Sequence, residues 1–149
     1  MNIQRWVWAS VAVTVVVVLL DMLIHGVMLS ETYKQTASVW RPESEMKQLA
    51  PLMWLGNALF APFFVWVYAQ GVQKGKDLFG QGLRFGLMFG IGVSAMGALV
   101  WYVVLPIPQK LAFAWFVGGV AVYAVAGVAA ALVYKTGNAK PAHSKKSGR

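Results

Sequence analysis

The chain has no cysteine, and its 149 residues include only five acidic residues and two histidines. Without a thiol it forms no internal disulfide, has no cysteine nucleophile and offers no cysteine ligand to zinc, haem or an iron–sulfur cluster. His25 lies in an apolar stretch and His143 in the basic C-terminal tail. In the topology that the charges favour, these two histidines lie on opposite sides of the membrane. One chain therefore cannot hold a haem between two histidines. Motifs of serine hydrolases, zinc proteases, phosphate-binding loops and dinucleotide-binding folds are also missing. We therefore expect no metal, no cofactor and no enzymatic activity.

Charged residues are also scarce, since they make up 12% of the chain, whereas hydrophobic residues make up 58%. Those proportions are typical of a small protein that crosses the bilayer several times. Four stretches supply the roughly 20 apolar residues that a helix needs to cross the hydrocarbon core. They are residues 6–29, 50–72, 83–105 and 110–134. The first stretch is too long for a cleaved signal peptide, so we predict an all-α bundle of four transmembrane helices in a single domain, residues 1–134.

The 13 basic residues are distributed unevenly along this topology. If the spans alternate in direction, nine lie on one side, and four, Lys34, Arg41, Lys47 and Lys110, lie on the other. By the positive-inside rule both termini then face the cytoplasm. The tail, residues 135–149, is basic and contains Gly, Pro and Ser, so we expect it to be disordered and attracted to anionic lipid. It lacks the aromatic platform of a nucleic-acid-binding surface, and we expect no nucleic-acid partner.

The connection between the first two spans, residues 30–49, is the longest and is predicted to face outward. Pro42 suits the first position of a helix, and Glu43 and Glu45 in the following turn favour the positive end of the helix dipole. We therefore predict a short interfacial helix from about Pro42, with Trp40 as an anchor at the membrane surface.

Small residues recur at every fourth position of the third span. They are Gly82, Gly86, Gly90, Ser94 and Ala98. Because small side chains let another helix backbone approach closely, this stripe predicts a helix-packing face, with a glycine-lined pore as the alternative.

Asp21 and His25 are ionisable residues inside the first span. Ionisable residues are costly in hydrocarbon, so they normally face protein or water and are candidates for function. A spacing of four puts both on one face of an α-helix, where their side chains can hydrogen-bond. Such a pair can hold a proton in two positions, as a relay requires. Alternatively, the pair satisfies itself and only fixes the packing of the helices.

Other polar residues extend this candidate intramembrane site. They are Asn57 in the second span and Tyr33, Trp40, Arg41 and Glu43 in the first loop. The guanidinium of Arg41 can reach back to Asp21, bind an anionic head group, or pair with a loop glutamate.

Three stretches resemble a group of small bacterial inner-membrane proteins that have four transmembrane helices and no assigned function. They are DMLIHGVMLSETY at 21–33, VWRPESEM at 39–46 and LPIPQKLAFAWFVGGVAVYAVAG at 105–127. The resemblance implies an intact multi-pass protein of the bacterial cytoplasmic membrane, and it carries over no catalytic residue.

Three hypotheses for function follow. The leading one is an accessory or structural subunit that packs through its glycine-rich third helix against a second copy or a larger membrane complex. The second is a small proton- or cation-coupled transporter that uses Asp21 and His25. The third is a membrane enzyme or a quinone- or lipid-binding protein. All three have the lipid bilayer as a partner.

Overall fold

The computed structural model describes residues 2–73 and 75–135, and these residues form helices joined by short connections. The elements are α1 (Ile3–Asp21), the π-helix η1 (Met22–Met28), α2 (Ser30–Gln35), the 3-10 turn η2 (Ala37–Val39), α3 (Glu43–Gly71), α4 (Leu78–Val104) and α5 (Gln109–Tyr134). Four helical stretches are long and apolar enough to cross a membrane: Ile3–Met28, Glu43–Gly71, Leu78–Val104 and Gln109–Tyr134. The predicted all-α fold with four such helices is confirmed. Apart from Lys135, the predicted tail lies outside the described residues.

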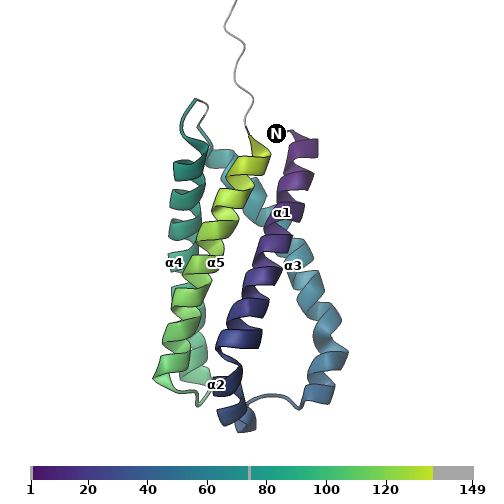
Figure 1. Ribbon diagram of the computed structural model, residues 1–149, viewed down its shortest axis with the longest axis vertical. Helices are drawn as coiled ribbons and strands as arrows, with labels where there is room; N and C mark the ends of the chain where they lie inside the picture. Colours follow the sequence, from purple (N-terminus) through teal and green to yellow (C-terminus); the bar gives the residue numbers. More distant parts are fainter. Residues whose placement is uncertain (1, 74, 136–149) are drawn as a thin grey trace, which may run out of the picture.

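The two ends of the bundle differ in what they carry. Figure 1 shows the N-terminus and the end of α5 at one end, which we call the terminal end. At the opposite end lie α2 and the turn between α4 and α5, so we call it the loop end. The start of α1 and the end of α5 therefore lie at the same end of the bundle.

The small-residue stripe of α4 is buried against α5 of the same chain. A Cβ atom added at Gly82 would meet the carbonyl oxygen of Gly127 at 2.5 Å, and one added at Gly86 would collide with the carbonyl oxygen of Tyr123. The two backbones are therefore closer than any larger residue would allow. Since α5 occupies this face, the stripe is not available to a second copy or to another protein.

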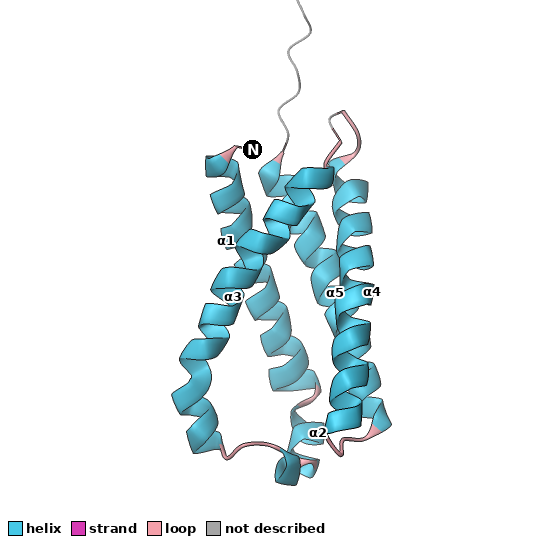
Figure 2. Cartoon of the chain, turned by 180° about the vertical axis from the view of Figure 1, so that it is seen from behind, coloured by secondary structure: helices cyan, strands magenta, loops and turns pink. Residues whose placement is uncertain are grey.

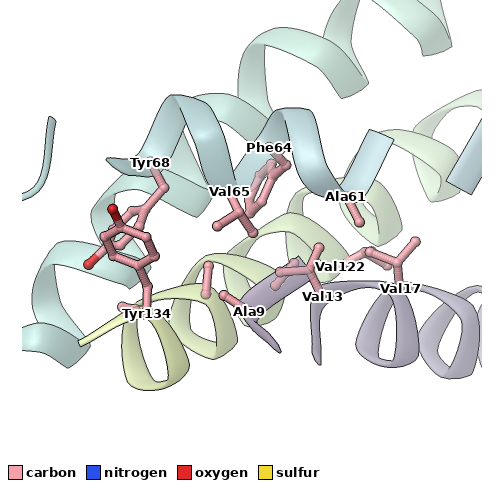
Figure 3. Packing of buried hydrophobic residues seen from close by; sticks show 12 residues of the cluster. Ala9, Val13, Val17, Ala61, Phe64, Val65, Tyr68, Val122 and Tyr134 are labelled. Carbon is pink, nitrogen blue, oxygen red and sulfur yellow. The ribbon is translucent and has the colours of Figure 1, made fainter. Parts of the chain in front are cut away.

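The core of the bundle lies between α1, α3 and α5, toward the terminal end (Figure 3). It contains Ala9, Val13 and Val17 of α1, Ala61, Phe64, Val65 and Tyr68 of α3, and Val122, Ala126, Ala130, Ala131 and Tyr134 of α5. The ring of Phe64 is fully buried, and its centroid lies 4.8 Å from that of Phe85 and 5.0 Å from that of Phe89 in α4. Trp6 Nε1 donates a hydrogen bond of 3.0 Å to the Pro62 carbonyl oxygen. These contacts hold α3 to the rest of the bundle.

The loop-end half of α3 makes no such contacts. From Ala61 to Tyr68 the helix buries four side chains, whereas residues 43–59 contain no buried residue. Figures 1 and 2 show the reason, because α3 diverges from α1 toward the loop end. The helix α3 is thus packed against the bundle at the terminal end and stands apart from α1 at the loop end.

The helix predicted from about Pro42 does not form a separate element. Pro42 is the N-cap of α3, which continues from Glu43 through Pro51 to Gly71. The short helix of the first loop is α2, Ser30–Gln35. Because Pro51 stays within α3, the predicted surface helix becomes the first turns of a long span.

Candidate functional site

A cavity of about 320 Å³ lies between α1, η1, α3, α4 and α5. Its polar lining consists of Asp21, His25, Asn57 and Ser94. Its aromatic lining consists of Phe60, Trp101, Trp115 and Tyr123. The volume falls in the range of small-molecule sites. Three of the residues that the sequence singled out, Asp21, His25 and Asn57, therefore meet in one cavity within the apolar part of the bundle.

A change of helix type separates Asp21 from His25. The α-helix ends at Asp21, and residues Met22–Met28 form a π-helix, in which each N–H bonds the carbonyl five residues back. The Leu29 N–H, for example, donates to the Ile24 carbonyl oxygen at 2.9 Å. A spacing of four no longer completes one turn, and the hydrogen bond predicted between Asp21 and His25 is not formed. Short π-helical segments are rare and frequently occur at functional sites.

His25 instead belongs to a hydrogen-bonded chain that runs to α5. Its Nδ1 lies 2.6 Å from the Tyr33 hydroxyl oxygen, and Trp115 Nε1 donates to that same oxygen at 2.7 Å. An indole N–H can only donate, so the Tyr33 hydroxyl accepts it and directs its own proton toward His25 Nδ1. This network assigns a neutral imidazole that carries its proton on Nε2. The side chain that lines the cavity thus keeps its Nε2–H free.

Tyr33 is suited to this role because it is held and half-buried. Burial raises the pKa of the Tyr33 phenol, the hydrogen bond from Trp115 opposes that shift, and the negative charge of Asp21 adds to it. The phenol therefore stays protonated at physiological pH and remains a donor. Trp40 packs edge-on against Tyr33, with ring centroids 5.5 Å apart, and also contacts Trp115. The Nε1 of Trp40 donates a hydrogen bond to Thr36 Oγ1 at 3.0 Å. Trp40 is therefore fixed in place and holds the rings of Tyr33 and Trp115 in position.

The remaining polar groups of the cavity have few partners inside the protein. Asp21 is half-buried and makes no hydrogen bond or ion pair with any other described residue. Ser94 is more than nine-tenths buried, and its hydroxyl has no partner. The Asn57 side-chain amide donates back to the Met53 carbonyl at 3.2 Å, which leaves its oxygen free. The site thus presents a carboxylate, an amide oxygen and an imidazole N–H to whatever enters, whereas the Ser94 hydroxyl oxygen is covered.

Arg41 and Glu43 do not belong to this site. Arg41, just before α3, pairs with Glu45 at 3.4 Å, and Lys47 pairs with Glu43 at 2.8 Å on the exposed first turns of α3. The sequence allowed Arg41 to pair with Asp21, with an anionic head group or with a nearby glutamate, and the structure shows the pair with a glutamate. Neither side chain lines the cavity.

Several residues of the site could not be singled out from the sequence. Ser94 was assigned only to helix packing, and Trp115, Tyr123 and Phe60 carry no motif. Their role arises because α3, α4 and α5 meet η1 around one cavity, and one sequence contains no periodic signal for such a meeting. The cluster of Ile107, Leu111 and Ala112 with Tyr33 and Trp40 at the loop end had no sequence signal either.

The described residues bring together no group of three or more His, Asp or Glu side chains that could hold a metal ion. Comparisons with protein-family models, with curated proteins and with solved structures found no match to this chain. Its function is therefore inferred from the cavity itself.

Proposed function

We propose that this protein is a small proton-coupled transporter of the bacterial cytoplasmic membrane, with both termini inside and its solute site in the loop-end cavity. The observation that supports the proposal is the meeting of Asp21, His25, Asn57 and Ser94 in one cavity of a bundle that is otherwise apolar. The uneven distribution of basic residues supports the orientation.

Asp21 is the group that couples the solute to the proton. An ionised carboxylate in a membrane interior needs an opposite charge or hydrogen-bond donors, and otherwise takes up a proton. No other described side chain provides either at Asp21 within hydrogen-bonding distance. Its carboxylate therefore alternates between a protonated state and a state that is stabilised by a bound solute. His25, with Nδ1 held by Tyr33, turns its Nε2–H toward the same cavity, where it can hydrogen-bond the water that receives that proton.

The test is proton movement in proteoliposomes with an imposed pH gradient, followed with a pH-sensitive dye. Three small aromatic solutes of different charge are added in turn: benzyltrimethylammonium, benzyl alcohol and benzenesulfonate. We expect one of these solutes to dissipate the pH gradient in proteoliposomes that contain the wild type. The same solute should dissipate the gradient more slowly with His25→Ala and not at all with Asp21→Asn. Glu43→Gln is the matched control, because it neutralises an exposed carboxylate that pairs with Lys47 outside the cavity. Background-level proton movement with every solute in all variants contradicts the proposal.

An accessory or structural subunit is the second candidate, and a different surface from the predicted one favours it. The glycine stripe is occupied by α5, but the loop-end half of α3 exposes Leu52, Met53, Trp54 and Leu55 by more than half. This surface suits a second copy or a larger membrane complex, and four helices are few for a carrier that acts alone. Native mass spectrometry from nanodiscs tests it, and a lone monomer would count against this candidate.

A further inference from the structure

Building on the proposed function, we infer that the solute of the loop-end cavity is a small lipophilic organic cation. Its positive centre pairs with Asp21, and its apolar body lies against the aromatic walls. The inference deepens the transporter proposal by naming the class of substrate.

The charge of the cavity selects for a cation. Among the described residues that line it, Asp21 is the only acid, and there is no Lys or Arg. The three basic side chains of the first loop and the start of α3 are each paired with a glutamate: Lys34 with Glu31, Arg41 with Glu45, and Lys47 with Glu43. An anion would meet an uncompensated carboxylate, whereas a cation would supply the opposite charge that Asp21 lacks.

His25 forms no ion pair with Asp21 in the structure, because its Nδ1 is engaged by Tyr33. If His25 were doubly protonated, Nδ1–H would donate to the Tyr33 oxygen, which already accepts the Trp115 N–H. The Tyr33 hydroxyl proton would then have no acceptor among the described residues. The chain of hydrogen bonds is complete only with a neutral imidazole. The other titratable groups that face Asp21 are Tyr33 of α2 and Tyr123 of α5, and both are neutral phenols. From α3 and α4 the cavity receives no titratable side chain.

The walls of the cavity suit the rest of such a molecule. Phe60, Trp101, Trp115 and Tyr123 come from α3, α4 and α5 and line one space with Asp21. The face of an aromatic ring attracts a cation, most strongly where water is excluded. Ser94 of α4 also lines this space, but its hydroxyl oxygen is covered and has no hydrogen-bond partner among the described residues. A carboxylate within aromatic walls is a site for an ammonium group that carries an aromatic or alkyl body.

The exchange balances in charge and atoms. When the cation enters, the protonated carboxyl of Asp21 releases its proton to water, and the carboxylate pairs with the cation. When the cation leaves, the carboxylate takes up a proton again. One positive charge replaces another, so no other reactant is needed. Solute and proton therefore compete for Asp21, and binding should weaken as the pH falls.

Equilibrium binding of radiolabelled benzyltrimethylammonium to the protein in nanodiscs tests the inference, with protein-free nanodiscs to correct for partition into lipid. We expect saturable binding that releases a proton into a weakly buffered solution. Asp21→Asn should weaken binding about tenfold or more, Asp21→Glu should retain it, and Glu43→Gln should match the wild type. His25→Ala should also keep its affinity within about threefold. Folding of each variant is checked by size-exclusion chromatography and thermal unfolding.

Neopentylbenzene, which has the same shape but a carbon in place of the charged nitrogen, distinguishes charge from shape. We expect it not to displace the label. If it competes as well as the unlabelled cation, or if Asp21→Asn binds like the wild type, the substrate class is wrong. Should benzyl alcohol or benzenesulfonate move protons through Asp21 in the proteoliposomes while the cation does not, the transporter proposal stands and only the cation is refuted. If no solute does so, both proposals fail.

Discussion

Tyr33→Phe removes one oxygen atom from the centre of the hydrogen-bonded chain at the loop end. The Tyr33 hydroxyl is bonded to His25 Nδ1 at 2.6 Å and to Trp115 Nε1 at 2.7 Å. Its loss leaves the half-buried indole N–H of Trp115 without an acceptor and frees His25 to change its tautomer. The phenyl ring still fills the space beside Trp40, so packing is retained.

The expected cost follows from these two groups. A buried donor left without a partner costs about 1–3 kcal/mol. Trp115 is only partly buried and His25 is exposed, so we expect the low end of that range, about 1–2 kcal/mol. For a protein of this size that corresponds to a fall of a few degrees in Tm.

Two measurements check this prediction. The first is thermal unfolding in detergent, with Tyr102→Phe as the control, because Tyr102 is exposed and makes no hydrogen bond with any described residue. The second is 15N NMR of protein labelled at histidine, with His143→Gln so that only the His25 imidazole is seen. The wild type should show a neutral ring protonated at Nε2, and Tyr33→Phe should show a shift toward the Nδ1–H tautomer or the cation. Unchanged stability together with an unchanged His25 spectrum would refute the assignment of this chain.

Two further predictions concern packing and topology. Gly86→Ala should destabilise the bundle by about 1–3 kcal/mol through overpacking, because its Cβ would collide with the Tyr123 carbonyl. Gly92→Ala, whose Cβ meets nothing within 4 Å, should leave Tm unchanged or raise it, and an equal effect of the two substitutions would contradict the close approach of α4 and α5. Since the chain has no cysteine, single cysteines report topology directly: in intact cells a membrane-impermeant maleimide should label Lys34→Cys in the first loop but not Lys76→Cys between α3 and α4. The reverse pattern would overturn the proposed orientation.

The first loop illustrates how far local patterns can be trusted. Pro42 and the two following glutamates correctly predicted a helix start, because capping and dipole effects act within one turn. They could not show that Pro51 stays within the same helix. The contacts of Trp40 with Tyr33 and Trp115 had no signal in the sequence, since they form only because the loop folds back over the start of α5.

The four helices and the small-residue stripe of α4 were readable from the sequence, because hydrophobic length and a spacing of four are properties of one segment. The sequence did not show which helix packs against that stripe, because a glycine such as Gly86 allows close approach by α5 and by a helix of another molecule equally well. Asp21, His25 and Asn57 could be named as candidates because polar residues are conspicuous in apolar spans. Their meeting in one cavity, the π-helix that turns His25 toward Tyr33, and the contact of Tyr33 with Trp115 were decided only by the tertiary structure. Each depends on residues that lie up to 82 positions apart, and such distant contacts arise from how whole helices pack.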